Sequence, residues 1–320
     1  MTDVVVTGIG TVNAIAHTVS QFRGALRSGT SGAGPITLFD PEGFATTIAA
    51  EVKDFDPKTV IDRKDARKMD RYSHFAVAAA IEAFNDAGLR ESGFDSERIG
   101  VVLGVGIGGF ESLEASYWSL FQSGPDRVSP MTIPKLIANI APAHIAIILD
   151  RQGPVLTITT ACASGTDAIG EAKRLIQSGV CDVVLAGGAE ASITKIGIAG
   201  FNSMQAMTTS YNDSPQRASR PFDRDRDGFL MGEGAGVLVL ESGEHAARRG
   251  ARARARLLGY GVSCDANHLT APHPEGRGAL PGLAGGAFGD ALLRHRPGRE
   301  ALLRPGRGPG QRLPRRSGHL

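Results

Sequence analysis

The sequence predicts an α/β fold in which helices cover both faces of parallel sheets. Short, continuously apolar runs recur along the chain, and stretches with helical periodicity lie between them. A strand that is apolar at nearly every position is buried on both faces, which is typical of parallel sheets. Strands of this kind alternating with helices indicate sheets layered between helices.

The predicted strands are runs of Val, Ile, Leu and small residues without the polar alternation of a half-exposed strand. They are residues 3–8 (DVVVTG), 99–104 (IGVVLG), 154–161 (PVLTITTA), 181–188 (CDVVLAGG) and 236–241 (GVLVLE). The predicted helices are residues 68–88, 134–149 and 164–178. The first helix places Phe75, Ala79, Ala83 and Ala87 at four-residue steps and stops at Gly88, a residue type that commonly ends helices.

The composition is that of an ordinary globular protein. Of 320 residues, 42% are hydrophobic and 21% charged, and a chain of this length buries a core without help from disulfides or metals. No apolar run approaches the roughly 18 residues that span a bilayer, and the N-terminus is acidic where a secretion signal is basic. The three cysteines, Cys162, Cys181 and Cys264, form no CxxC pair, and an odd count argues against a disulfide framework. We therefore expect a cytoplasmic protein that binds neither a metal nor a membrane.

Residues 279–320 differ from the rest of the chain. They consist largely of Gly, Pro, Arg, Ala and Leu, and they contain no β-branched residue. Eight arginines against Asp290 and Glu300 give them a charge of +6, so residues 1–278 carry −4. An acidic globular part attracts nucleic acid little, and no nucleic-acid partner is expected. The segment is either a basic tail or the product of a shifted reading frame; we favour the second interpretation because nothing upstream has this composition.

Cys162 has a setting that suits a nucleophile. It follows the strand 154–161 and precedes Ser164, which opens a predicted helix. A thiol at a helix N-terminus meets unpaired backbone N–H groups and the positive end of the helix dipole, which favour the nucleophilic thiolate. The same amides could hold the oxyanion that forms when a thioester carbonyl is attacked. A buried structural cysteine is the alternative, and spacing alone does not exclude it.

Two glycine patterns imitate a dinucleotide-binding loop. Residues 104–109 (GVGIGG) satisfy GxGxxG, whereas the pattern that begins at Gly8 and Gly10 lacks the third glycine. No acidic residue follows the pattern at Gly8 and Gly10 where a ribose contact is expected, and no clear βαβ unit follows residues 104–109. A nicotinamide-dependent oxidoreductase is therefore one hypothesis. The other is that glycine permits close backbone approach beside a ligand cavity.

Two further patterns suggest no separate site. Arg252, Arg254 and Arg256 alternate as on the solvent face of a strand, which explains them better than a nucleic-acid patch. His74 and His144 lie within helix patterns and are expected to be structural. None of the eight histidines has surroundings that identify a general base.

The segment TTACASGTDAIGEAKRLIQSGVCDVVLAGGAE around Cys162 is similar to the nucleophile region of the β-ketoacyl synthases, the condensing enzymes of fatty-acid and polyketide synthesis. Collinear blocks extend the similarity: VVVTGIG, RKMDRYSHFAVAAAIEAFNDAGL, GVGIGG, SRPFDRDRDGFLMGEGAGVLVLE and RGARARARLLGYGVSCDANHLTAPHPEGRG. Together they cover nearly all of residues 3–278. Within the family the chain most resembles the bacterial elongating synthases of KAS II type. Chain-length-factor relatives replace the nucleophile, which is present here as Cys162.

The resemblance implies a thiolase-like fold of five layers, αβαβα, built from two similar halves. Residues 1–250 would form a complete first half-domain that carries the nucleophile. Residues 251–278 would only begin the second half-domain, and residues 279–320 show no resemblance. We therefore expect a synthase that is truncated or frameshifted after about residue 278.

The resemblance also implies a ping-pong condensation. Cys162 takes an acyl group from acyl carrier protein, malonyl carrier protein loses carbon dioxide, and the resulting carbanion attacks the acyl thioester. Ile107 and Phe201 match positions that line the acyl pocket, and Thr270 matches the approach of the phosphopantetheine arm. No other cofactor is implied, and the full-length family forms homodimers.

The chain departs from the family pattern in its missing histidines. The family uses a His-Gly-Thr motif, a Lys-Ser-x-x-Gly-His block and a Gly-Phe-Gly-Gly loop, and none of these occurs here. Without imidazoles to stabilise the enolate, condensation slows by orders of magnitude. We expect a 3-oxoacyl-[acyl-carrier-protein] synthase by ancestry that is inactive in condensation. The alternatives are a polyketide ketosynthase and a non-catalytic fragment that binds acyl groups or a carrier protein.

Overall fold

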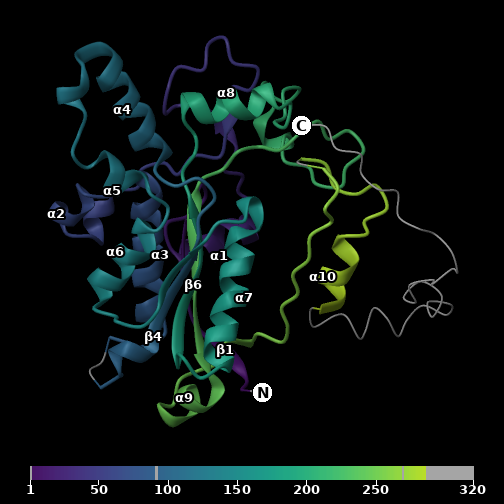
Figure 1. Ribbon diagram of the computed structural model, residues 1–320. Coiled ribbons are helices and arrows are strands. Elements are labelled where there is room, and N and C mark those ends of the chain that lie inside the picture. Colours follow the sequence, from purple (N-terminus) through teal and green to yellow (C-terminus); the bar gives the residue numbers. More distant parts are fainter. Residues whose placement is uncertain (1, 91–92, 269, 286–320) are drawn as a thin grey trace, which may run out of the picture. The chain divides into compact units, whose positions relative to one another are not determined.

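The computed structural model describes residues 2–90, 93–268 and 270–285 (Figure 1). The chain divides into two compact units, residues 1–257 and 258–320. The strands of the first unit are β1 (Val4–Asn13), β2 (Gly34–Pro35), β3 (Ile48–Ala49), β4 (Ile99–Gly104), β5 (Val155–Ile158), β6 (Val183–Glu190), β7 (Gly234–Ser242) and β8 (Ala255–Arg256). Its α-helices are α1 (Val19–Ser28), α2 (Arg63–Ala66), α3 (Arg71–Asp86), α4 (Phe110–Ser123), α5 (Thr132–Leu136), α6 (Ile140–Leu149), α7 (Ser164–Gln177), α8 (Lys195–Ser203) and α9 (Gly243–Arg248).

Short 3₁₀ turns join several of these elements. They are η1 (Pro57–Thr59), η2 (Ser96–Arg98), η3 (Pro125–Arg127), η4 (Ala161–Ala163) and η5 (Pro215–Arg217). The described part of the second unit contains one helix, α10 (Ala279–Gly285). The reading-frame hypothesis concerns residues 279–320, of which residues 286–320 lie outside the described residues. Over the described ranges, no helix combines the length and the apolar character needed to cross a membrane.

A six-stranded mixed sheet forms the centre of the first unit, in the order β5-β4-β6-β7-β1-β8. β5, β4 and β6 are parallel, whereas β7 runs antiparallel to both β6 and β1, and β8 runs antiparallel to β1. The prediction of wholly parallel sheets is therefore wrong. β1 and β7 are as apolar as parallel strands because they too are buried, so composition does not reveal their direction.

Helices cover both faces of this sheet (Figure 1). α3 and α6 pack on one face, where Val183 and Leu185 of β6 are buried. α7 packs on the other face, against Val184 and Ala186 of the same strand. Neighbouring residues of one strand point to opposite layers, as the pleat requires. The first unit thus has the α-β-α layering expected of the first half-domain.

Two predicted elements differ from the structure. The helix expected over residues 134–149 is two helices, α5 and α6, because Ile137 has extended backbone angles between them. β5 was expected to be buried, but it lies at the sheet edge, where Val155 and Leu156 are each 39% exposed. An edge strand has a neighbour on one side only, and its apolar composition does not show that.

The glycines of β1 allow α3 to pack directly on the strand. A Cβ atom on Gly8 would lie 2.1 Å from the Ala83 carbonyl oxygen, and one on Gly10 would lie 1.9 Å from that of Ala79. Ala79 and Ala83 belong to the predicted stripe of α3, and both are fully buried. Gly8 and Gly10 therefore allow the backbone of β1 to lie directly against the backbone of α3, which explains this glycine pattern without a ligand.

β8 adds a short strand to the sheet of the first unit, whereas residues 251–278 are predicted to begin the second half-domain; that domain boundary stays a prediction. β8 pairs with β1, and the backbone N–H of Leu257 donates to the Val4 carbonyl. Arg254 forms an ion pair with Asp86, and Arg256 forms one with Asp3 at 2.8 Å. Arg252, Arg254 and Arg256 are exposed, as predicted, but only Arg256 lies within β8, and the strand is too short to contain all three.

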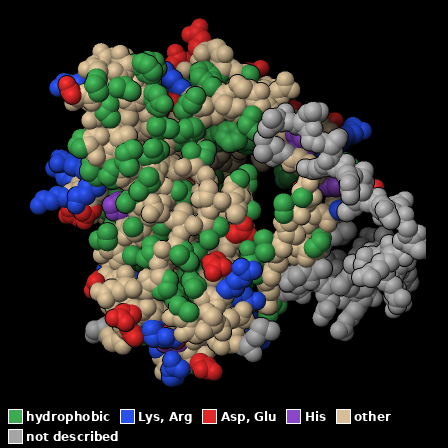
Figure 2. Space-filling view, in the orientation of Figure 1, with side chains coloured by type: hydrophobic (Ala, Val, Ile, Leu, Met, Phe, Trp, Pro, Cys, Tyr) green, Lys and Arg blue, Asp and Glu red, His purple; other side chains and the backbone are tan. Residues whose placement is uncertain are grey.

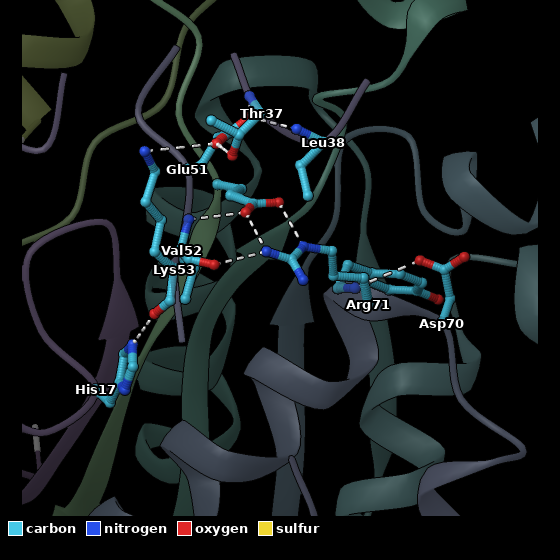
Figure 3. Close-up of polar contacts among 10 residues, drawn as sticks. His17, Thr37, Leu38, Glu51, Val52, Lys53, Asp70 and Arg71 are labelled. Atoms are coloured by element: carbon cyan, nitrogen blue, oxygen red, sulfur yellow. Dashed lines mark hydrogen bonds and ion pairs between the residues drawn. The ribbon is translucent and has the colours of Figure 1, made fainter. Parts of the chain in front are cut away.

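Arg71, the first residue of α3, joins three segments of the first unit through a buried ion pair (Figure 3). Its Nε and Nη2 atoms donate to Glu233 at 2.9 and 2.6 Å, and Nη2 also donates to the Val52 carbonyl at 2.7 Å. The side chain of Glu233 is only 1% exposed. Burial alone would lower the pKa of Arg71, but the hydrogen bonds and charge of Glu233 raise it. The pair holds α3, residue 52 and the start of β7 together.

His74 of α3 and His144 of α6 are expected to make the stability of the protein depend on pH. Burial lowers the pKa values of His74 and His144 below 6.5. The unfolded chain therefore binds protons first, so stability is complete above about pH 6.5 and falls as the pH drops below it. We expect urea denaturation to show a smaller loss between pH 6.5 and 5.5 in the double variant His74→Gln/His144→Gln than in the wild type. Equal losses in both proteins would contradict this assignment.

Candidate active site

The carboxyl ends of three parallel strands lie at the same end of the sheet. The segments that follow these strands form the candidate site. β4 continues into the loop of residues 105–109, β5 into the turn that carries Cys162, and β6 ends at Glu190. α8 follows β6. Ligand sites of α/β proteins characteristically lie outside the carboxyl ends of parallel strands. Ile107, Cys162 and Phe201 all belong to these segments.

Cys162 lies in the 3₁₀ turn η4, directly before α7. The residue before it, Ala161, has a φ of 51°, in the left-handed region that costs a residue with a side chain roughly 1–2 kcal/mol. The Cys162 side chain is exposed, whereas Cys181 is buried. The buried structural role that the sequence left open for Cys162 therefore describes Cys181.

Two side chains of α7 hold the strained turn. The Ser164 hydroxyl accepts a hydrogen bond from the Thr160 amide at 2.9 Å and donates to the Ala161 carbonyl at 2.6 Å. Ser164 is buried. The Thr160 hydroxyl donates to Asp167 at 2.6 Å. The residues on either side of Cys162 are therefore tied to the first turns of α7, which limits how far the thiol can move.

Glycines place the N-terminus of α7 directly on the strand ends. A Cβ atom on Gly104, the last residue of β4, would lie 2.2 Å from the Ser164 carbonyl carbon and 2.4 Å from the Gly165 nitrogen. A Cβ atom on Gly165 would lie 3.6 Å from the Cα of Gly188 in β6. The helix end thus packs against strand backbone with almost no side chain between them.

The backbone amide of Cys162 is available to a ligand. Among the described residues, no acceptor is found for this N–H group, and the neighbouring Ala163 amide donates to the Thr160 carbonyl at 3.1 Å. An amide at the start of a helix stabilises negative charge. The arrangement therefore offers a thiol together with an oxyanion donor.

Glu190 accounts for the glycine-rich loop after β4. Its Oε2 atom accepts hydrogen bonds from the Gly106 amide at 3.0 Å and the Ile107 amide at 2.8 Å, and its Oε1 atom accepts a longer one from Gly108 at 3.4 Å. A dinucleotide would need these N–H groups for its pyrophosphate. A carboxylate of the protein already occupies them, which argues against the nicotinamide hypothesis.

The far side of the loop is fixed to the C-terminal end of α5. The Gly109 amide donates to the Leu136 carbonyl at 3.0 Å, and the Tyr72 hydroxyl donates to the next carbonyl, that of Ile137, at 2.9 Å. Burial raises the pKa of Tyr72 to about 12, so the hydroxyl stays protonated and remains a donor at all physiological pH values. The loop is therefore held from both sides.

The other two predicted site residues lie in different surroundings. Phe201 of α8 packs on the apolar cluster that contains Ile198 and Met207, and its ring meets Phe229 edge-on with centroids 5.3 Å apart. Thr270 belongs to the second unit, where its amide donates to Nδ1 of His268 at 3.2 Å. Ile107 thus lies in the loop next to the turn that carries Cys162. Phe201 lies on α8, the helix that follows β6.

The sequence analysis did not assign roles to Ser164, Asp167 or Glu190. A signal for Glu190 is present, because the apolar strand VVLAGGAE ends in a carboxylate, and carboxylates at the end of a buried strand need partners. Those partners are backbone amides 82 to 84 positions away, which no local pattern indicates. Over the described ranges, no cluster of three His, Cys, Asp or Glu side chains is arranged to hold a metal ion.

Comparison with known proteins gives concordant results. Residues 1–246 match the family model described as "Beta-ketoacyl synthase, N-terminal domain". The 3-oxoacyl-[acyl-carrier-protein] synthase 2 of Synechocystis sp. is 48% identical over 281 residues, which are 88% of this chain and 67% of that protein. The chain thus spans about two thirds of the length of this curated relative.

Solved structures agree with the sequence comparison. The ishigamide ketosynthase/chain length factor superposes with a TM-score of 0.81 at 38% identity, covering 91% of this chain and 70% of that one. The type II polyketide ketosynthase AntDE, solved in complex with its acyl carrier protein AntF, gives a TM-score of 0.81 at 30% identity with the same coverage. These similarities support the layering described above.

Proposed function

Because the chain belongs to the β-ketoacyl synthase family, we propose that Cys162 accepts acyl groups from acyl carrier protein, as in 3-oxoacyl-[acyl-carrier-protein] synthases of fatty-acid elongation. The exposed thiol on the strained turn before α7 is the observation that carries the proposal. The curated relative at 48% identity bears that enzyme's name, which favours fatty-acid over polyketide substrates.

The geometry of the turn supports the following transfer step. The Cys162 sulfur, as thiolate, attacks the carbonyl carbon of the acyl thioester and forms a carbon–sulfur bond. The carbonyl oxygen becomes an oxyanion, which the Cys162 amide stabilises. Collapse breaks the bond to the sulfur of the carrier's phosphopantetheine, and that sulfur takes up the proton that Cys162 released. The chain needs no cofactor of its own for this step.

Condensation belongs to the whole protein of the family type. There, malonyl carrier protein loses carbon dioxide, and the carbanion attacks the acyl-Cys162 carbonyl to give the 3-oxoacyl product. The two histidines that stabilise the enolate in the family are not in this sequence. We therefore propose that the chain takes up acyl groups but does not condense them. A fragment that only binds acyl groups or the carrier is the alternative.

A carrier protein would meet a basic surface toward the end of the sheet at which Cys162 lies. α2 and the residues after it present the exposed cations Arg63, Lys64, Arg67 and Lys68, and Lys68 pairs with Asp65. Figure 2 shows blue side chains beside red ones at the left edge, where Figure 1 places α2. α2 precedes α3. Gly10, near the carboxyl end of β1, packs on Ala79 of α3, so the N-terminal end of α3 lies at the same end of the sheet as Cys162. A partner with an acidic surface fits this position.

The sheet edge at β5 supports the proposal of a homodimer. Val155 and Leu156 are partly exposed on this edge strand, and Ile147 of the neighbouring helix α6 is 74% exposed. Pairing with β5 of a second copy would satisfy the free strand edge and cover these side chains.

The free thiols of Cys162, Cys181 and Cys264 support a reducing, cytoplasmic setting.

Intact-protein mass spectrometry tests the acyl-transfer proposal. The wild type is mixed with acyl carrier protein that carries a straight-chain acyl thioester, and it is expected to gain the mass of one acyl group. Cys162→Ala is expected to gain none. A folded wild type that gains no mass would refute the proposal and leave the binding-fragment alternative. A polyketide acyl thioester that reacts faster than the straight-chain one would overturn the fatty-acid assignment. Sedimentation equilibrium of the same samples tests the homodimer.

A further inference from the structure

We infer that Glu190 is a positioning residue, which fixes the loop of residues 105–109 beside Cys162 and thereby sets which acyl chains the thiol accepts. The acyl group in this inference rests on the proposed function. The position of the loop rests on contacts of Glu190 that hold whatever the ligand is.

Three consecutive amides converge on the Glu190 carboxylate. Those of Gly106 and Ile107 share one oxygen, at 3.0 and 2.8 Å, and that of Gly108 reaches the other at 3.4 Å. Hydrogen bonds to a charged acceptor are roughly twice as strong as those between neutral groups. The carboxylate therefore determines the path of the loop backbone between the ends of β4 and β6.

The loop so held lies next to the nucleophile. A Cβ atom on Gly106 would lie 2.9 Å from Glu190 Oε2 and 3.8 Å from the carbonyl oxygen of Ala161, the residue before Cys162. Ile107 is the only residue between positions 106 and 109 that has a side chain. That side chain is 40% exposed. Any shift of this backbone moves an apolar side chain relative to the thiol.

The remaining anchors of the loop are at its two ends. The Val105 amide donates to the Ile158 carbonyl of β5 at 3.0 Å, and the Gly109 amide donates to the Leu136 carbonyl at 3.0 Å. Between these ends, Glu190 accepts the hydrogen bonds that the amides of Gly106, Ile107 and Gly108 donate. Loss of the carboxylate frees the middle of the loop while its ends stay attached, so the fold survives and the position of Ile107 becomes variable.

A variable Ile107 would weaken discrimination by chain length. A well-formed apolar pocket distinguishes chains that differ by one methylene by about 10-fold or more. A pocket wall that moves loses this discrimination, since it adapts to chains of different lengths. Glu190 therefore contributes to specificity without touching the acyl chain.

The experiment labels Cys162 in two ways, in a Cys264→Ala background that removes the other exposed thiol. N-ethylmaleimide and N-octylmaleimide report the ratio of long-chain to short-chain access without any acyl transfer. Butyryl and decanoyl thioesters of acyl carrier protein report the same ratio for the proposed reaction. Glu190→Ala is expected to weaken the discrimination, which changes the ratio by about 10-fold. Glu190→Gln keeps one acceptor oxygen and is expected to change the ratio by less.

Glu51→Ala is the matched control. Glu51 is buried and clasps the amides of Thr37 and Leu38 in the same way, but it does not contact residues 105–109 (Figure 3). Its loss is expected to lower stability and leave the chain-length ratio unchanged. A ratio that changes equally in Glu51→Ala would show a general effect of destabilisation and would overturn the inference.

A double substitution tests whether Glu190 acts through Ile107. In an Ile107→Ala background, Glu190→Gln is expected to leave the ratio within about twofold, because the side chain it positions is gone. A full effect in that background, or no effect of a folded Glu190→Gln in the wild-type background, would refute the positioning role. If maleimide ratios change but no thioester reacts, the proposed function fails and the role of Glu190 in positioning the loop stands.

Discussion

Replacing Arg71 by methionine is expected to lower the free energy of unfolding by about 3–5 kcal/mol. The substitution keeps much of the side-chain volume but leaves Glu233, only 1% exposed, with its charge buried and two hydrogen bonds lost. The Val52 carbonyl loses a donor as well. Urea denaturation followed by circular dichroism measures the change.

Two controls separate this effect from a general loss of positive charge. Lys68→Met breaks the exposed pair with Asp65, at 2.9 Å, and is expected to cost less than about 1 kcal/mol. The double variant Arg71→Met/Glu233→Gln removes both buried charges and is expected to recover part of the loss. If the double variant is as unstable as the sum of its two single variants, the buried unpaired charge is not the cause.

Gly104→Ala is expected to cost about 3 kcal/mol, at the upper end of the range for overpacking. The new Cβ atom would lie within 2.4 Å of three backbone atoms of Ser164 and Gly165, and backbone cannot rotate away as a side chain can. The helix end must then move off the strand, and Cys162 moves with it. We therefore also expect a slower reaction of Cys162 with iodoacetamide under conditions in which the variant is folded.

Gly236→Ala is the control for this substitution. Gly236 lies in the same sheet, and a Cβ atom there would have no atom within 4 Å. Its replacement is expected to be neutral or to stabilise by about 0.4–1 kcal/mol through the unfolded chain. If both substitutions lower stability equally, loss of glycine in the sheet matters more than the contact of β4 with α7.

The sequence predicts the elements of the first unit better than their arrangement. The strand of residues 99–104 has the predicted bounds, and the stripe from Phe75 to Ala87 is buried on α3 as expected. Strand direction could not be predicted, since β7 is as apolar as the parallel β4. The edge position of β5 depends on the number of its neighbours, which is a property of the assembled sheet.

The candidate site divides in the same way. Cys162 is visible in the sequence because a cysteine between a buried strand and a helix is a local pattern, and the family resemblance supports it. Glu190 depends on amides more than 80 residues away, and the role of Ser164 depends on the strained angle of Ala161. Such contacts form only in the folded chain. Thr270 lies in the other unit, and its predicted role stays a prediction.

The position of β1 between β7 and β8 delays the completion of the fold during synthesis. β1 ends at Asn13, and both strands that flank it begin at or after Gly234. At about 5–20 residues per second, a ribosome needs roughly 10–50 seconds to make the intervening chain. β4, β5, β6 and α7, which are close in sequence, can assemble within that time. The first strand to be synthesised is therefore among the last to be paired, and until then both of its edges lack a strand partner.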